Sequence, residues 1–91
     1  PDRFVLKQNY PNPFNPATKI RFSIPNDLNY GITNLNIFDV TGRVVKEYSY
    51  GKLTPGEYEV DFKAEELPSG VYFYRVSSGA FSETRKMVLL K

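Results

Sequence analysis

Short runs of β-branched and aromatic residues recur along the whole chain, and most of them are ended by glycine, proline or asparagine. Such residues favour strands because their side chains pack well on a pleated surface, whereas the interrupting residues favour turns. Residues 64–67 suit one helical turn, but four residues before Pro68 cannot sustain a helix, and we interpret them as a loop. Because no other segment has convincing helical periodicity, the sequence predicts an all-β chain.

The clearest predicted strand covers residues 18–24, where apolar residues at 20, 22 and 24 alternate with polar residues at 19, 21 and 23. With six similar segments, the predicted strands are 4–7, 18–24, 33–40, 43–48, 57–62, 71–77 and 81–90. The Tyr72-Phe73-Tyr74 run indicates a central strand with both faces covered. Short strands at this spacing in about 90 residues predict an immunoglobulin-like antiparallel β-sandwich of about seven strands, with an open barrel as the alternative.

Two glycine-containing turns are predicted between these strands. Gly42 can supply a positive φ for a tight reversal, and Asp39 is expected to cap the same turn through an Asx hydrogen bond. Pro55 and Gly56 fit the two central positions of a type II turn. These turn signals agree with an antiparallel fold.

Composition restricts the size and the chemistry of the domain. A chain of 91 residues makes a single domain, 1–91, and its seven Phe and seven Tyr are needed for the core, which leaves little room for a deep ligand cavity. The chain contains neither cysteine nor histidine, so disulfides, thiolate nucleophiles and the usual general bases and zinc ligands are excluded. Glu65 and Glu66 are interpreted as solvated loop residues. We therefore predict no enzyme activity, no cofactor and no bound metal.

Charge and hydropathy exclude two further classes. The 12 Lys and Arg against 10 Asp and Glu give a net charge of +2, too small and too evenly spread for a nucleic-acid binder. No apolar run reaches the roughly 18 to 20 residues of a transmembrane helix. The first residues, Pro1-Asp2-Arg3, are neither an initiator methionine nor a signal peptide, and we expect the chain to be a fragment of a larger protein.

Closely spaced prolines make residues 9–16 stiff. They fix φ at their own positions and restrict the residue before each to extended or turn conformations, and they are Pro11, Pro13 and Pro16. One interpretation is structural: the segment covers a sheet edge, while Tyr10 and Phe14 fill the end of the sandwich. The other interpretation is recognition of the segment by a partner.

The chain ends with four apolar residues between two lysines, in the order Lys86-Met87-Val88-Leu89-Leu90-Lys91. Taken alone, this segment is equally well interpreted as a last strand whose charged ends limit aggregation at the sheet edge. It gains meaning from its combination with residues 9–16.

Several segments together resemble one known family. They are Asn9-Tyr10-Pro11-Asn12-Pro13-Phe14-Asn15-Pro16 followed by Thr18-Lys19-Ile20-Arg21-Phe22, the turn region from Ile37 to Val45 around Gly42, the stretch from Leu67 to Val76 with its Gly70, and the ending 86–91. In this combination, residues 6–91 resemble the C-terminal sorting domain of the type IX secretion system in its type A form, the Por secretion tail family.

This resemblance implies a sorting function, in which binding replaces chemistry. The expected role is a C-terminal secretion signal that directs a covalently fused N-terminal cargo from the periplasm across the outer membrane of a Bacteroidetes-like, Gram-negative bacterium. The expected partners are the outer-membrane translocon and the shuttle protein of type IX secretion. A sortase-like surface peptidase is expected to cleave the domain off, with the protein ending at the cell surface or outside the cell.

The resemblance also implies which residues carry the signal. The sorting-signal candidates are Lys86, Met87, Val88, Leu89, Leu90 and Lys91, and the family scaffold motif is Tyr10, Pro11, Asn12, Pro13, Gly42, Gly70 and Tyr72. We expect the terminal strand 83–91 to offer an exposed edge to a partner sheet, with alternate side chains giving specificity. Within the signal, the strongest candidates are Lys86, Val88, Leu90 and Lys91.

Two other functions fit the same composition. An accessory immunoglobulin-like or carbohydrate-binding module of a secreted enzyme would use an exposed row of aromatic rings, for which Tyr30, Tyr48 and Tyr50 are the candidates. A purely structural sandwich, similar to the immunoglobulin-like part of the flagellar hook-capping protein, would not need the basic-apolar-basic ending.

Overall fold

The computed structural model describes residues 3–26 and 31–91, which form strands connected by turns and loops. The strands are β1 (Val5–Leu6), β2 (Ala17–Ile24), β3 (Ile32–Phe38), β4 (Val44–Lys52), β5 (Gly56–Lys63), β6 (Gly70–Ser78) and β7 (Phe81–Leu89). The all-β prediction is confirmed, and each predicted strand is present with its ends moved by at most four residues. Within the described ranges no helix is long and apolar enough to cross a membrane.

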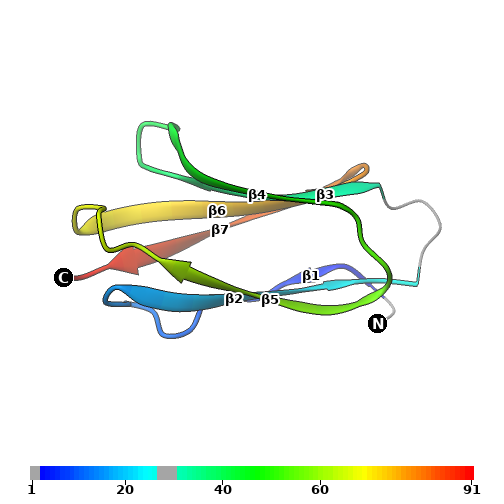
Figure 1. The fold of residues 1–91 in the computed structure, drawn as a ribbon, viewed down its shortest axis with the longest axis horizontal. Helices are drawn as coiled ribbons and strands as arrows, with labels where there is room; N and C mark the ends of the chain where they lie inside the picture. Colours follow the sequence, from blue (N-terminus) through cyan, green and yellow to red (C-terminus); the bar gives the residue numbers. More distant parts are fainter. Residues whose placement is uncertain (1–2, 27–30) are drawn as a thin grey trace.

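The strands form two antiparallel sheets that pack face to face (Figure 1). One sheet has three strands in the order β1-β2-β5, and the other has four in the order β4-β3-β6-β7. The chain passes from the four-stranded sheet to the three-stranded sheet between β4 and β5 (Figure 1). This arrangement agrees with the predicted immunoglobulin-like β-sandwich. Because the strands form two separate sheets, the open-barrel alternative is wrong.

The core lies between the sheets and is built from alternate residues of the strands. In β2 the inward residues Ile20, Phe22 and Ile24 are at most 2% exposed, as the alternation predicts. The remaining core side chains are Leu6, Phe14, Leu35, Ile37, Val60, Phe62, Ala64, Tyr72, Tyr74, Val76, Met87 and Leu89. Since burial of one large apolar side chain contributes about 1.5–3 kcal/mol, this shared core is the main force that holds the two sheets together.

Two local predictions are wrong. Gly56 is the first residue of β5, pairs with Ile24, and has φ of 152°, whereas the second central position of a type II turn needs φ near +80°. Strand pairing therefore determines the conformation here, and the type II turn is absent. The run Tyr72-Phe73-Tyr74 does lie in a central strand, but only its tyrosines are buried, because Phe73 points to the outer face and is partly exposed.

Candidate functional site

The two ends of the sequence pattern, residues 9–16 and 86–91, lie against each other at one end of the sandwich (Figure 1). The amide of Phe14 donates to the carbonyl of Val88 at 2.9 Å, and the amide of Leu90 donates to the carbonyl of Phe14 at 3.0 Å. These two bonds form an isolated parallel bridge between Phe14 and Leu89. Two segments separated by most of the chain thus form one structural unit.

Side chains from the first segment occupy further main-chain groups of β7. The Val88 amide donates to Asn12 Oδ1 at 3.0 Å, and Gln8 Nε2 donates to the carbonyl of Lys86 at 2.8 Å. The predicted covering of a sheet edge by the proline-rich segment is therefore confirmed. The edge that we expected β7 to leave exposed is instead occupied by residues 8–14 over residues 86–90, because these polar groups satisfy its outward-facing donors and acceptors.

The two aromatic residues of the proline-rich segment have opposite surroundings. Phe14 is 2% exposed and its ring centroid lies 6.0 Å from that of Phe62, so it fills the sandwich end as predicted. Tyr10 is 73% exposed, and that part of the prediction is wrong. Tyr10 exchanges both backbone hydrogen bonds with Lys19, and because directly paired residues share a face, its side chain lies on the same solvated side as Lys19.

Asn9 is a central residue of this unit that the sequence analysis did not single out. It is 2% exposed, and its backbone amide donates to the hydroxyl of Tyr74 at 2.8 Å. Asn9 Nδ2 donates to Thr18 Oγ1 and to the carbonyl of Pro11, both at 3.1 Å. An asparagine beside prolines suggests a turn, and only the partners on β2 and β6 show that it is buried and bonded.

Tyr74 of β6 hydrogen-bonds the main chain of Lys7 and Asn9, which holds this part of the chain on the four-stranded sheet. Its hydroxyl donates to the carbonyl of Lys7 at 2.8 Å while it accepts from Asn9. Burial raises the pKa of Tyr74 to about 12, because the charged phenolate would lose its solvation. Tyr74 therefore stays a neutral hydrogen-bonding group over the physiological pH range.

The six sorting-signal candidates divide between the core and the surface. Met87 and Leu89 are fully buried at 0% exposure, whereas Leu90 is 55% exposed, Val88 is partly exposed and Lys86 is exposed. The strand alternation of β7 produces this division, since successive side chains point to opposite faces. The strongest candidates named from the sequence are thus those that the structure leaves accessible.

Lys91 and Gly70 connect the candidate segment 86–91 to β6 and to the loop before it. The Lys91 amide donates to Ser69 Oγ at 2.9 Å, and its ammonium donates to the carbonyl of Glu65. Gly70 begins β6, pairs with Leu89 and has φ of 155°. Tyr72, also of the scaffold motif, is 4% exposed and donates through its hydroxyl to the carbonyl of Pro68 at 2.7 Å. The Leu67 to Val76 landmark therefore lies directly beside the last six residues.

The Gly42 turn has the geometry predicted for it. Gly42 has φ of 89°, and its amide donates to the carbonyl of Asp39 at 3.0 Å. Asp39 Oδ1 accepts from the amides of Thr41 at 2.9 Å and Arg43 at 3.1 Å, which confirms the Asx cap. The hydrogen bond from the Thr41 hydroxyl is the largest cause that holds the pKa of Asp39 below its usual value.

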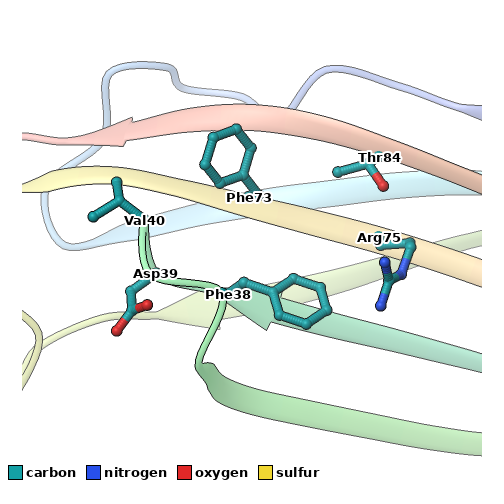
Figure 2. Close-up of a pocket in the computed structure, with 7 residues that line it drawn as sticks. Phe38, Asp39, Val40, Phe73, Arg75 and Thr84 are labelled. Carbon is teal, nitrogen blue, oxygen red and sulfur yellow. The ribbon is translucent and has the colours of Figure 1, made fainter.

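A hollow of 410 Å³ opens on the outer side of the four-stranded sheet beside this turn. Figure 2 shows its aromatic walls, Phe38 from β3 and Phe73 from β6, with Val40 at one end and Arg75 and Thr84 at the other. The lining combines two phenylalanines and Val40 with the guanidinium of Arg75, the hydroxyl of Thr84 and the carboxylate of Asp39, which is hydrogen-bonded within the Gly42 turn. Within the described residues, no group of three or more His, Cys, Asp or Glu could hold a metal ion.

The tyrosines considered for glycan binding lie at the margin between the sheets. The rings of Tyr48 and Tyr50 are nearly parallel, at 5° and 6.4 Å between centroids, and Tyr50 is 37% exposed. Tyr50 also packs at 6.3 Å against the buried Phe22, and burial raises the pKa of both tyrosines. Tyr30 lies outside the described residues. Of the two described rings, Tyr48 thus packs against the core, while Tyr50 is more exposed and contacts Phe22, so they do not form a free row of rings.

Comparisons with known proteins test the family resemblance of these segments. No curated protein and no solved structure matches the chain. The family model described as "Secretion system C-terminal sorting domain" matches residues 8–90, a range that includes the proline-rich segment, both glycine landmarks and most of the signal candidates. The chain belongs to this family, which confirms the predicted resemblance, and the domain is a C-terminal sorting domain of type IX secretion.

Proposed function

We propose that this domain is the address by which type IX secretion exports a larger protein. The covalently fused N-terminal cargo is directed from the periplasm across the outer membrane, through contacts of the domain with the translocon and the shuttle protein. A sortase-like surface peptidase then removes the domain. The observation that carries this proposal is the family match over residues 8–90, together with the hydrogen bonds that join its two ends into one unit.

We further propose a division of labour within the terminal segment. The partner reads the accessible residues Lys86, Val88, Leu90 and Lys91, while Met87 and Leu89 hold β7 on the core. The scaffold residues keep the terminal strand in place, since Asn12 accepts from Val88 and Gly70 pairs with Leu89. The domain acts by binding, and the cargo supplies whatever activity is exported.

The test is an export assay with residues 1–91 fused behind a periplasm-targeted fluorescent reporter. The fusion is expressed in a host with type IX secretion and in an isogenic strain without the translocon, and reporter is measured in the periplasm, at the cell surface and in the medium. We expect export in the first strain only. Reporter that stays in the periplasm of both strains, although the domain is folded, would overturn the proposal. The reporter without the domain controls for leakage.

A simple deletion of residues 86–91 does not separate signal from fold, because it also removes the core side chains Met87 and Leu89. The sharper variant combines Lys86→Ala, Val88→Thr and Leu90→Ser, which changes only accessible side chains. We expect it to lose export while the domain keeps its thermal unfolding transition. Lys63→Ala, an exposed change on the other sheet, is the matched control and should be exported normally.

A further inference from the structure

The outer side of the four-stranded sheet carries a cluster of apolar side chains that has no role in the core. Phe38 pairs directly with Phe73 of β6 and with Val44 of β4, and Val71 pairs with Val88. Because directly paired residues share a face, these five side chains form one continuous surface, which we call the aromatic face. Val44 is 48% exposed and the other four are partly exposed.

The hollow described above lies within the aromatic face. Phe38 and Phe73 flank it, and Val40, at 69% exposure, stands at its end (Figure 2). The solvated face of an antiparallel sheet is normally polar, and a contiguous apolar surface with a concave centre is characteristic of an interaction site. A hollow walled by two aromatic rings can accommodate an apolar side chain of a partner, as an interface does for its central anchor.

Positive charges stand beside the hollow. The guanidinium of Arg75 lies 4.7 Å from the centroid of the Phe38 ring, and Lys86 is paired with Phe73 on β7. Among the residues that the structure describes, neither cation lies within salt-bridge distance of a carboxylate. Asp39 also lines the hollow, but its carboxylate is hydrogen-bonded within the Gly42 turn and paired with Arg43, and Glu47 lies across from Asn36. The surface is therefore apolar at its centre with unpaired positive charge at its rim.

The accessible part of the signal strand belongs to the same surface. Val88 is a member of the aromatic face and Lys86 is part of its positive rim. The edge of β7 offers no comparable site over residues 86–90, because Phe14, Asn12 and Gln8 occupy its main-chain groups. A partner that reads the signal strand of the folded domain must therefore approach its face and not its edge.

We propose that the aromatic face is the docking surface of this domain, and that its occupant is a protein surface with an apolar anchor residue surrounded by carboxylates. This inference rests on the proposed function, since the protein concerned would be a component of the export machinery. Charge complementarity selects acidic groups at the partner's rim, where they would steer association and fix register. A flat sugar ring is not the occupant, because Arg75 already covers one face of Phe38.

The first test replaces the centre of the face. Phe73→Thr keeps a residue with high strand propensity but removes the aromatic wall, and we expect export of the reporter fusion to fall at least about tenfold, as for the loss of an interface anchor. The matched control is Ile32→Thr, because Ile32 is 65% exposed on the outer side of the same sheet but at the opposite end of β3. The control should be exported like the unchanged domain.

A second series tests the charge of the partner and does not depend on the stability of the first variant. At the exposed position 75, we expect export to decrease in the order Arg75→Lys, Arg75→Gln, Arg75→Glu, with the reversal lowest. Equal export of the three variants, or better export of Arg75→Glu, would contradict the proposal that the partner's surface carries carboxylates around its anchor residue. Purified variants are compared by thermal unfolding, so that loss of fold is recognised, and the arginine series decides the matter if Phe73→Thr unfolds.

The outcomes separate the two proposals. If the unchanged domain is not exported, the proposed function fails. If it is exported and the folded Phe73→Thr and Arg75→Glu variants are exported equally well, the docking surface fails alone. Sedimentation of the purified chain and pelleting with anionic lipid vesicles test the other occupants. A dimer, or vesicle binding, that disappears with these same substitutions would overturn the assignment to a protein of the machinery.

Discussion

The outer faces of the two sheets differ sharply in chemistry although both belong to the same sandwich. On the three-stranded sheet, an ion-pair ladder joins Lys19 to Glu59 at 3.3 Å and to Asp61 at 2.7 Å, and Arg21 to Glu59 at 2.8 Å. We call these four residues the charged face. On the four-stranded sheet the corresponding surface is the aromatic face. Solvent alone favours a charged outer face, whereas the exposed apolar area of the aromatic face is unfavourable in water and is the basis of the docking surface proposed above.

The comparison assumes that both faces rest on one cooperative core, and Phe14→Ala tests this assumption with the largest expected effect. Removal of this buried ring should lower the free energy of unfolding by about 3–5 kcal/mol, because it leaves a cavity beside Phe62 and loosens β7. Denaturant unfolding followed by tyrosine fluorescence measures it. Tyr10→Ala, at a position 73% exposed, should change stability by less than about 0.5 kcal/mol. Equal effects of the two variants would contradict the model of one shared core.

Tyr74 lies between Phe73 and Arg75 in β6 and is buried on the inner side of the sheet. Its hydrogen bonds therefore hold the strand that carries the aromatic face. Tyr74→Phe should cost about 1–3 kcal/mol, since it leaves the buried amide of Asn9 and the carbonyl of Lys7 without their partner. Tyr72→Phe is the control, because its hydroxyl bonds only the carbonyl of Pro68 near the surface, and it should cost less. An equal cost for both would show that the Asn9 network contributes nothing specific.

Tyr74 also gives a signature at alkaline pH. Its pKa rises from the ordinary 10.0 to about 12 on folding, so the folded state retains a proton that the unfolded state has lost. The corresponding stability is complete below pH 10 and is lost as the pH rises from 10 towards 12. The decline should be weaker in Tyr74→Phe, with a remainder from other tyrosines whose pKa is also raised. If stability declined with pH as steeply in Tyr74→Phe as in the unchanged domain, the alkaline dependence would come from groups other than Tyr74.

The smallest expected effect distinguishes the two faces by their response to acid. Hydrogen bonds from Arg21 and Lys19 hold the pKa of Glu59 below its usual 4.5, and one from Lys19 holds that of Asp61 below 3.8. The unfolded chain therefore binds more protons, and the stability these groups contribute is present above those values and is lost as the pH falls through the lowered ones. Unfolding measured from pH 6 to pH 2 should depend less steeply on pH in Glu59→Gln.

A variant of the aromatic face is the control for that measurement. Phe73→Thr changes no titratable group, so its unfolding curve should shift without a change in acid dependence. Added salt should reduce the acid dependence of the unchanged domain, since the pairs of the charged face are exposed and screened. A pH profile of Glu59→Gln that superimposes on that of the unchanged domain would show that the ion-pair ladder has no measurable role.

Predictions from the sequence succeeded where a residue's own conformational preference or the period of two decided the outcome. The alternation in β2, the positive φ of Gly42 and the Asx cap of Asp39 are local properties, and all are present. Prediction failed for Tyr10 and for Gly56, because in each case pairing with β2 determined the geometry. Asn9 was missed for the same reason, since its partners Thr18 and Tyr74 are not recognisable until the strands are packed.

The candidate site shows the same division. The sequence identified the proline-rich segment and the final six residues, and it indicated that both belong to one family pattern. It did not show that they touch, that residues 8–14 close the edge of β7, or that Met87 and Leu89 are core residues while Val88 and Leu90 face outward. Those facts depend on which side of β7 faces the other sheet.

By itself, the sequence determined that this chain is an all-β sandwich without cysteine or histidine, and it carried the pattern of a sorting domain. These properties follow from composition, strand period and turn chemistry, which act over a few residues. Only the tertiary structure decided that Phe38 and Phe73 of separate strands meet on one surface, and that β7 exposes its outer face while its edge is covered over residues 86–90. Such juxtapositions arise from strand order and register, which long-range packing sets and local preference does not encode.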